Sequence, residues 1–193
     1  ESTLWSLGLV YARPANNLES RLRAGRVDMA LDSFNDGALT DEYEGERVFA
    51  QWSNVWTPEA LSSLIDPVVS FGIEYQDETA KTDTAFNAPL SVSEELWSAY
   101  AAVQAGLTAR FDVTGSIRFD DYDAFGGQTT WNLGAVYRLD ALNTRVRASY
   151  GTSFKAPSLS ERYSSSAFVA ANPDLDPEEG QTCLLYTSPS PRD

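Results

Sequence analysis

The sequence predicts an all-β chain, namely a partial antiparallel up-and-down transmembrane β-barrel of about eight strands. Three observations predict it. Apolar and polar residues alternate over segments of roughly ten residues, the links between these segments differ in character, and aromatic residues gather at the segment ends. No apolar run approaches the roughly 20 residues that a transmembrane helix needs, whereas a transmembrane strand needs about 10 and turns only alternate ones to lipid.

The alternation has a period of two and is clearest in residues 69–76. One face of this segment carries Val69, Phe71, Ile73 and Tyr75. Polar or small residues fill the other face. Successive side chains of a strand point to opposite faces, so this period indicates strands and not helices. The same period fits residues 131–139 and 144–151.

The segments with this strand pattern also have informative lengths. Most are near the roughly 9–11 residues that cross a bilayer at a tilt, and longer than the roughly 5–6 residues of an ordinary globular strand. In chain order the expected strands are residues 3–12, 18–31, 44–56, 68–77, 94–105, 113–123, 128–139 and 144–154.

The links between the expected strands alternate in character, which assigns an orientation. The links after the first, third, fifth and seventh strands are mostly short. Those after the second, fourth and eighth are longer and polar, and the sixth is a Gly-rich turn. An up-and-down barrel has short periplasmic turns and longer outer loops, so the longer links are expected outside the cell. Most acidic residues fall at this outer end: Asp32, Asp36, Asp41, Glu42, Glu44, Glu46, Asp77, Glu78, Asp83, Glu94, Glu95, Asp120, Asp121, Asp123, Glu161, Asp174, Asp176, Glu178 and Glu179.

Aromatic residues lie toward both ends of the expected strands. Two aromatic girdles flanking an apolar band are typical of a barrel in lipid. The outer end carries Trp5, Tyr75, Trp97, Trp131 and Tyr150, and the inner end carries Tyr11, Trp56 and Tyr137. Any antiparallel sheet can place aromatics on a buried face. A soluble secreted β-sandwich that acts as a binding module is therefore the alternative of another class, and it predicts shorter strands and one solvated face.

Composition excludes several functions. Asp and Glu number 28 against 14 Lys and Arg, a net charge of −14, so nucleic acid is not an expected partner. The chain has no His, the commonest general base and metal ligand. It also lacks a Gly-rich phosphate loop and a nucleophile elbow, so we expect no enzyme.

The last residues, 183–193, resemble the translation of a sequencing adapter. They begin at Cys183, the only cysteine in the chain. If they are an artefact, no thiol chemistry remains. We therefore expect residues 1–182 to form one partial barrel and residues 183–193 to be adapter-derived, with the chain ending just as a further strand should begin.

Two segments near the end of the chain carry a family resemblance. Residues 147–163 read Arg-Ala-Ser-Tyr-Gly-Thr-Ser-Phe-Lys-Ala-Pro-Ser-Leu-Ser-Glu-Arg-Tyr, and residues 172–179 read Asn-Pro-Asp-Leu-Asp-Pro-Glu-Glu. Both resemble signature elements of the TonB-dependent outer-membrane receptors, and the hairpin of residues 117–137 also looks like this family. The elements end one strand and introduce the next, so turn chemistry explains their Gly and Pro residues. The motif residues expected at the barrel rim are Tyr150, Gly151, Phe154, Lys155, Pro157, Asn172, Pro173, Leu175, Pro177 and Glu178.

The resemblance implies a function and partners. It implies a receptor and transporter in the outer membrane of a Gram-negative bacterium that takes up a scarce nutrient. Within the family the motifs look most like the vitamin B12 (cobalamin) receptor branch, with a ferric-siderophore receptor as the alternative. The implied partners are outer-membrane lipid and lipopolysaccharide, the ligand, and the TonB energy complex acting through a plug domain that is not in this sequence.

One acidic group is a candidate binding site. Asp120, Asp121, Tyr122 and Asp123 lie together at a strand end, where they could contact the ligand or a cation. Carboxylate oxygens suit Ca²⁺, and calcium-ordered outer loops are known in cobalamin receptors. The spacing is not that of a calcium-binding EF-hand loop, so a solvated acidic rim is the favoured interpretation, and no cofactor or metal is assigned.

Charged residues are also expected on the polar face of the strands, where a barrel has its lumen. They are Arg118, Arg138, Arg145 and Arg147, together with Asp28, Glu74 and Asp120. There they would meet the plug or one another.

Overall fold

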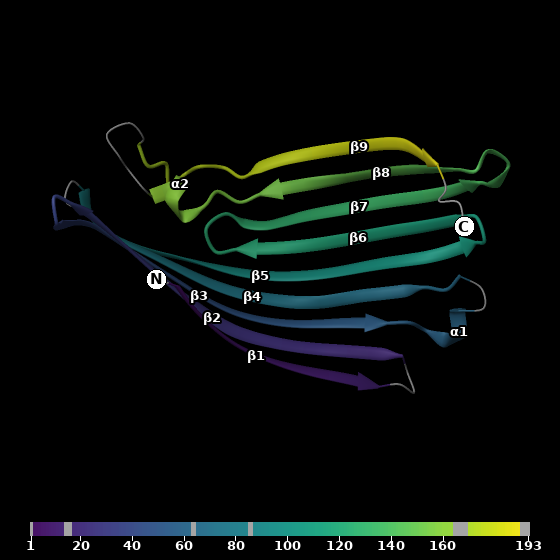
Figure 1. Cartoon of the computed structure of the whole chain (residues 1–193), viewed down its shortest axis with the longest axis horizontal. Coiled ribbons are helices and arrows are strands. Elements are labelled where there is room, and N and C mark those ends of the chain that lie inside the picture. The colour runs from purple at the N-terminus through teal and green to yellow at the C-terminus, as the bar shows by residue number, and fades with distance from the viewer. Residues whose placement is uncertain (1, 14–16, 63–64, 85–86, 164–169, 190–193) are drawn as a thin grey trace.

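The computed structural model describes residues 2–13, 17–62, 65–84, 87–163 and 170–189, which form one antiparallel sheet (Figure 1). Its nine strands follow one another in chain order, each paired with its sequence neighbours. The strands are β1 (Ser2–Arg13), β2 (Leu18–Asn35), β3 (Ala38–Trp56), β4 (Val68–Thr84), β5 (Asn87–Thr108), β6 (Phe111–Tyr122), β7 (Gly126–Leu139), β8 (Thr144–Lys155) and β9 (Glu178–Pro189). The predicted all-β up-and-down architecture is confirmed.

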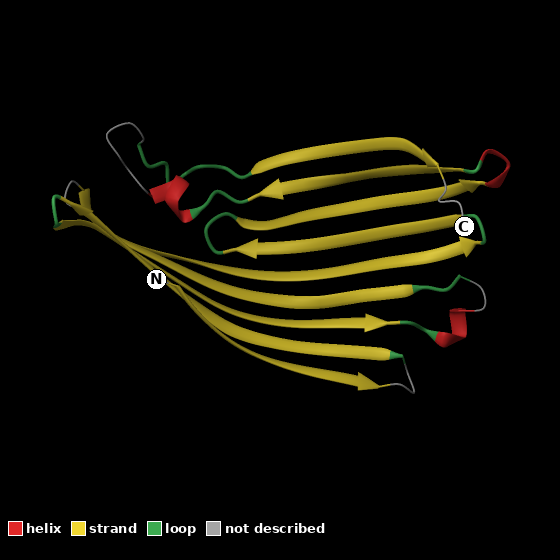
Figure 2. Ribbon diagram, viewed as in Figure 1, coloured by secondary structure: helices red, strands yellow, loops and turns green. Residues whose placement is uncertain are grey.

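The helical elements are short and lie at the ends of strands (Figure 2). They are α1 (Glu59–Ser62), α2 (Leu159–Tyr163) and the 3₁₀ turn η2 (Asp140–Leu142). Among the described residues, no helix is long and apolar enough to cross a membrane. We call the end of the sheet with α1 and η2 the turn end, and the end with α2 the loop end.

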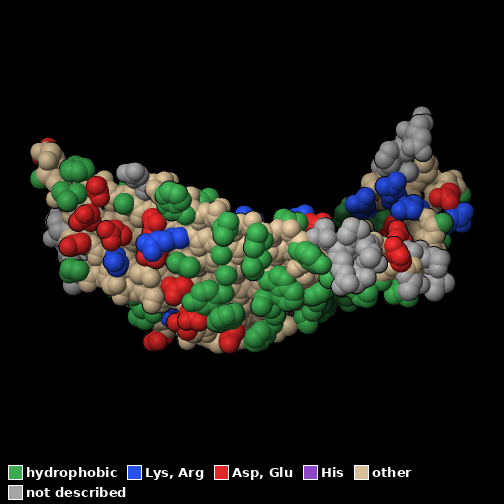
Figure 3. All heavy atoms as spheres, turned by 90° about the horizontal axis from the view of Figure 1, so that it is seen from below, with side chains coloured by type: hydrophobic (Ala, Val, Ile, Leu, Met, Phe, Trp, Pro, Cys, Tyr) green, Lys and Arg blue, Asp and Glu red, His purple; other side chains and the backbone are tan. Residues whose placement is uncertain are grey.

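The sheet is a single curved layer that does not close on itself. In the part of the chain that the structure describes, the sheet order ends at β1 and β9, which do not pair with each other. The curvature is visible in Figure 3. A meander of this kind is an arc of the wall of a larger barrel.

The final strand extends the predicted count of about eight. Strand β9 pairs with β8 from the Lys155–Glu178 pair onward, and its second half consists of residues from Cys183 on. Cys183 lies opposite Tyr150, and Thr187 lies opposite Val146. The adapter origin of residues 183–193 stays a prediction, because a backbone ladder can form whatever the origin of the residues.

The predicted long links after the second and fourth strands are wrong, since most of these residues belong to strands. β2 runs on to Asn35 and β3 begins at Ala38, so only Asp36 and Gly37 connect them. Both have a left-handed backbone, with φ of 50° and 84°, as a two-residue hairpin turn requires. Likewise β4 extends to Thr84 and β5 begins at Asn87. In these extensions both faces carry polar residues, so the alternation that marks a strand in the sequence is absent.

The strand register sorts the side chains into two faces. One row across the sheet consists of Leu9, Leu22, Trp52, Ile73, Ala99 and Phe119. The adjacent row, which points the other way, consists of Gly8, Arg23, Gln51, Glu74, Ser98 and Asp120. We call these sides the apolar face and the polar face. The alternation predicted from the sequence therefore holds across six neighbouring strands.

The apolar face is exposed, and little of the described chain forms a hydrophobic core. Ala105 and Leu159 are the only buried hydrophobic residues among those described, whereas Ile117 is 52% and Leu133 58% exposed. Figure 3 shows hydrophobic side chains gathered across the middle of the curved wall. A contiguous apolar surface that crosses many strands is expected to be covered by something other than water. Lipid can cover it, because the strands of a closed barrel satisfy one another's backbone hydrogen bonds. The described residues form one layer, so the β-sandwich alternative is not supported.

Aromatic rings flank the apolar band on the same face. Toward the loop end, the rings of Tyr75 and Trp97 lie 4.7 Å apart and those of Trp131 and Tyr150 lie 5.4 Å apart. Toward the turn end, Tyr137 lies 6.3 Å from Phe111. On β7 the two aromatic rows are six residues apart, roughly 20 Å at about 3.3 Å per residue, which is close to the apolar band of about 25 Å in outer-membrane barrels.

Candidate functional site

The first half of the motif ends strand β8. The Tyr150 side chain lies on the apolar face, and its hydroxyl donates to Oε1 of Gln181 on β9 at 3.0 Å. Gly151 is buried where β8 meets β7. A Cβ at Gly151 would lie 2.7 Å from Asn132 Nδ2 and 2.8 Å from the Trp131 carbonyl oxygen. The contact requires a glycine here, because no larger residue fits without moving the β7 backbone.

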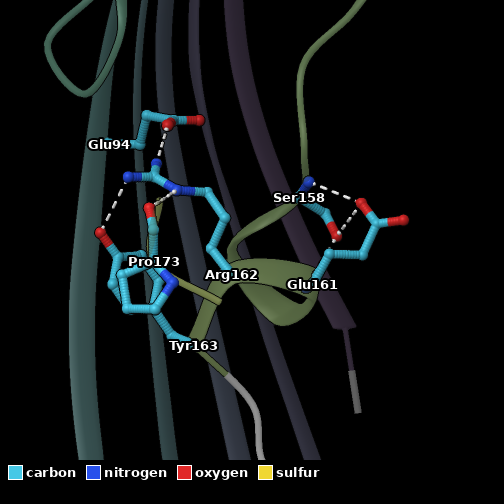
Figure 4. Close-up of polar contacts among 6 residues, drawn as sticks. All are labelled: Glu94, Ser158, Glu161, Arg162, Tyr163 and Pro173. Atoms are coloured by element: carbon cyan, nitrogen blue, oxygen red, sulfur yellow. Dashed lines mark hydrogen bonds and ion pairs between the residues drawn. The ribbon is translucent and has the colours of Figure 1, made fainter. Parts of the chain in front are cut away.

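Helix α2 begins where the chain leaves the sheet, directly after the buried Pro157. Its start is a capping box formed by Ser158 and Glu161 (Figure 4). The Ser158 backbone N–H donates to Glu161 Oε2 at 2.8 Å, and the Glu161 N–H donates to Ser158 Oγ at 3.2 Å. The Ser158 hydroxyl also donates to Glu161 Oε2, at 2.9 Å. The two hydrogen bonds that the carboxyl accepts from Ser158 lower the pKa of Glu161, and the Lys155 ammonium lowers it further. The local sequence therefore fixes the helix start.

Replacing Ser158 with Ala should loosen α2. The loss of the cap is expected to destabilise this helix by about 1 kcal/mol. Amide hydrogen exchange of residues 159–163 in the receptor should become several-fold faster than in the parent. Ser116→Ala, at an exposed position on β6, serves as the control. Unchanged exchange in the Ser158 variant would contradict the capping role.

Arg162 on α2 is the most deeply buried arginine described, with 6% of its surface exposed. Its Nη1 lies 2.8 Å from Glu94 Oε1 on β5, its Nε donates to the Pro173 carbonyl oxygen at 3.3 Å, and its Nη2 donates to the Tyr163 hydroxyl at 3.0 Å (Figure 4). The guanidinium also lies over two rings, 4.9 Å from the centroid of Tyr163 and 5.7 Å from that of Phe125. One side chain thus connects β5, the β6–β7 turn, α2 and the segment before β9.

An aromatic cluster supports this arginine. Phe125 stacks on Tyr122 at 4.5 Å, and Phe154 lies 5.8 Å from Tyr122 and 6.1 Å from Phe125. Phe154 comes from the end of β8, and Phe125 from the β6–β7 turn. The cluster therefore joins two hairpins at the loop end.

The two halves of the motif meet at the loop end. Lys155 Nζ lies 3.6 Å from Glu161 and 4.0 Å from Glu178. Arg162 reaches Pro173 in the second half, where the Leu175 N–H closes a turn on the Asn172 carbonyl at 3.1 Å. These positions agree with a rim-shaping role for the motif, which stays a prediction.

The acidic group of residues 120–123 does not converge. Asp120 is buried on the polar face, where it accepts from Arg118 Nε at 2.8 Å and from Ser98 Oγ at 2.5 Å. Asp121 points to the opposite face, paired with Trp97 and Gly127. Tyr122 belongs to the aromatic cluster, and the Asp123 N–H donates to the Glu95 carbonyl at 3.1 Å. Within the described ranges, no group of three or more metal-ligating side chains forms.

The polar face carries a charged network along the wall. Arg118 also contacts Glu74 at 2.8 Å, and Gln51 Nε2 donates to Glu74 Oε1 at 2.6 Å. Nearer the turn end, Arg138 contacts Asp112 at 2.7 Å. Arg145 and Arg147 share this face, as predicted.

The prediction for Asp28 is wrong. Asp28 lies on the side of the apolar face, where it contacts Arg26 at 2.8 Å. Arg26 lies opposite Trp5 and Asp28 opposite Thr3, so the pair lies at the loop-end edge of the apolar band. Neither member contributes to the polar face.

Sequence reasoning missed the contact between Glu94 and Arg162. The two residues are 68 positions apart, and no local pattern links them. One local signal was present, since Ser158 and Glu161 have the spacing of a helix start. It would have predicted α2 but not its partner.

Glu94 should make stability depend on pH. Burial raises the pKa of its carboxyl above the usual 4.5; the Arg162 guanidinium lowers it, and the charges of Asp123 and Glu78 raise it again. A carboxyl whose pKa is higher when folded contributes stability that is full below the unfolded pKa and is lost as pH rises through the raised value. Glu94→Gln should therefore flatten the pH dependence of the unfolding free energy between the pKa of Glu94 in the unfolded chain and its raised pKa in the folded protein.

Denaturant unfolding of the receptor at a series of pH values measures this effect. Glu95→Gln, the neighbouring carboxylate on the opposite face, is the control and should keep the parental profile. A parental profile in the Glu94 variant would refute the assignment.

The geometry defines a class of protein. A curved meander of long strands, apolar and aromatic-flanked on one face and charged on the other, is a segment of an outer-membrane β-barrel wall. The profile of the family described as "TonB dependent receptor-like, beta-barrel" matches residues 1–182. The chain belongs to the TonB-dependent receptor family, a family of transporters and not of enzymes, which resides in the outer membrane of Gram-negative bacteria.

Individual relatives agree with this membership. The chain is 27% identical over 190 residues to the vitamin B12 transporter BtuB of Photobacterium profundum, covering 97% of this chain and 29% of that protein. It is 44% identical over 70 residues to BtuB of Vibrio vulnificus, covering 36% of this chain and 10% of that protein. Among solved structures, the siderophore receptor PirA from Pseudomonas aeruginosa superposes with a TM-score of 0.80 at 19% identity, over 96% of this chain and 35% of PirA. The chain thus spans about a third of the length of the Photobacterium profundum transporter and of PirA.

Proposed function

We propose that this chain is part of the wall of a TonB-dependent transporter that carries cobalamin across the outer membrane. The observation that carries the proposal is the likeness to vitamin B12 transporters over nearly the whole chain. The likeness is highest over one 70-residue stretch, at 44% identity. Energised uptake suits a nutrient that is too large and too scarce for passive diffusion.

The two faces suit this function. The apolar face would contact outer-membrane lipid. The polar face would line the lumen, where its charged network meets a plug domain, and the TonB complex would act on that plug. The loop end would lie outside the cell and capture the ligand, with divalent cations bridging its acidic residues to lipopolysaccharide. This orientation is supported by the extension of β2–β5 beyond the apolar band at the loop end and by the connection from β8 to β9 there, since barrels of this kind have their longer loops outside the cell.

A ferric siderophore is the second candidate ligand. The fold is compatible with a siderophore receptor as well as with a cobalamin receptor, because the siderophore receptor PirA superposes on nearly the whole chain. At 19% identity this likeness concerns the fold, so sequence likeness gives cobalamin the preference.

Growth of a suitable host tests the proposal. The full-length receptor is expressed in a Gram-negative host that requires cobalamin and lacks its own cobalamin receptor. Growth on nanomolar cyanocobalamin is expected, and it should disappear when the host lacks TonB. Growth that depends on ferric chelates, with no response to cyanocobalamin, would overturn cobalamin in favour of the siderophore.

A further inference from the structure

Helix α2 lies on the polar face of the wall. Its Arg162 contacts the carboxylate of Glu94, and the register places Glu94 on the same face as Ser98 and Glu74. The connection after β8 therefore begins by folding toward the lumen side and not toward lipid. Figure 4 shows Arg162 between Glu94 of the wall and Pro173.

The Arg162 contacts cross between parts of the chain that the local sequence does not hold together. The β8–β9 connection is anchored to β8 at one end and to β9 at the other, and its capping box orders only the start of α2. Arg162 supplies an ion pair to β5, a hydrogen bond to the Pro173 carbonyl and a ring contact to Phe125. A planar guanidinium can make these contacts at once, because its donors are fixed in direction and its faces can stack on rings.

The ion pair between Arg162 and Glu94 is largely buried. The side chains of Arg162 and Glu94 are 7% and 13% exposed. Removing one partner of such a pair leaves the other charge buried without a counter-ion, a state that the segment can relieve only by moving into water. Breaking the pair is therefore expected to release the segment from the wall.

We propose that Arg162 is a positioning residue that docks α2 and the turn of residues 172–175 on the lumen side of the wall, and that ligand capture depends on this docked state. The inference rests on the proposed function, because it assigns these segments to the mouth through which the ligand enters. Ligand affinity falls when the segments are released, since binding must first restore their order.

The experiment measures the position of the turn after α2 and the binding of ligand separately, and it uses the full-length receptor in outer membranes. Spin labels at positions 91 and 174, both exposed, report the distance between the loop end of β5 and the turn after α2. The variants are Arg162→Gln and Glu94→Ala, which break the same contact from opposite sides. Arg138→Gln is the matched control, because Arg138 also joins a carboxylate, Asp112, and a backbone carbonyl, that of Ala109, but at the turn end.

The parent and the Arg138 control should show one narrow distance distribution. Both Arg162→Gln and Glu94→Ala should broaden it, and the double variant should add little to either. Cyanocobalamin affinity should fall roughly tenfold in the two variants at equal outer-membrane abundance. The distance is measured without ligand, so a parent that fails to bind cyanocobalamin overturns the proposed function alone. A narrow distribution in both variants overturns the docking role, and broad distributions with parental affinity overturn its link to ligand capture.

Discussion

Replacing Ile117 with Arg should sharply reduce insertion of the receptor into the outer membrane. Ile117 lies in the central part of β6 on the apolar face, with 52% of its surface exposed, and neither neighbouring strand offers it a carboxylate. An arginine on the lipid face of a barrel near the bilayer midplane costs about 2–4 kcal/mol. The folding free energy into lipid vesicles should fall by that amount.

The adjacent residue provides the control. Ser116 precedes Ile117 on the same strand but points to the polar face, where arginines such as Arg118 already occur. Ser116→Arg should therefore insert at close to the parental level. Equal losses in the two variants would mean that the two faces do not differ in environment.

Replacing Gly151 with Val should prevent correct assembly of β7 and β8. The new Cβ alone would come within 2.8 Å of the Trp131 carbonyl oxygen, and the branched carbons would need further space. Overpacking costs about 1–3 kcal/mol when side chains can adjust, and more is expected here because backbone atoms must move. Heat-modifiable migration of the receptor on gels, which reports a folded barrel, should be lost or strongly reduced.

Gly45 is the matched glycine. It lies in β3 between two paired strands, and a Cβ there would have its nearest neighbour at 3.8 Å, an ordinary contact with Met29. Gly45→Val should therefore fold like the parent. A folded Gly151→Val receptor would show that the contact at β7 can be relieved at little cost.

The sequence predicts well what the bilayer imposes. A strand in a wall between lipid and lumen alternates strictly, so residues 69–76 revealed both their structure and their two faces. The strand starts on β4 and β8 and the end of β7 were predicted to the residue for the same reason. The family was predicted from the resemblance of the residues around Tyr150 to its signature, and turn geometry explains the Gly and Pro residues in that signature.

The wrong predictions concern residues outside or at the edge of the apolar band, where the bilayer no longer requires apolar and polar residues to alternate. Residues 32–35 and 38–43 continue the ladder outside the apolar band, where polar side chains on both faces hide the strand period, so the sequence predicts a link there. The face of Asp28 is mispredicted within the expected strand of residues 18–31, because the register places the apolar Val27 and Met29 on the polar face and so turns the residue between them to the other side. In both cases the backbone hydrogen bonds continue although the pattern of side chains does not.

The candidate site was predicted only in part. The motif residues Phe154, Lys155 and Pro173 each make a contact at the loop end, and their rim-shaping role stays a prediction. The acidic group of residues 120–123 is divided because consecutive strand residues point to opposite faces. Glu94 and Arg162 are 68 positions apart in the sequence and meet only in the folded chain, so no local sequence pattern predicts their contact.

Accessibility along β4 tests the central claim that this chain is a wall between lipid and lumen. Spin labels are placed singly at residues 69–71 and 73–75 of the full-length receptor in outer membranes, and their collisions with oxygen, which concentrates in lipid, are compared with those of a water-soluble relaxant. Gly72 is left unlabelled, because a Cβ there would lie 2.5 Å from the Trp52 carbonyl oxygen. Positions 69, 71, 73 and 75 should show high oxygen access and positions 70 and 74 low oxygen access. A profile without this period of two, or high access of the water-soluble relaxant at position 73, would contradict the account.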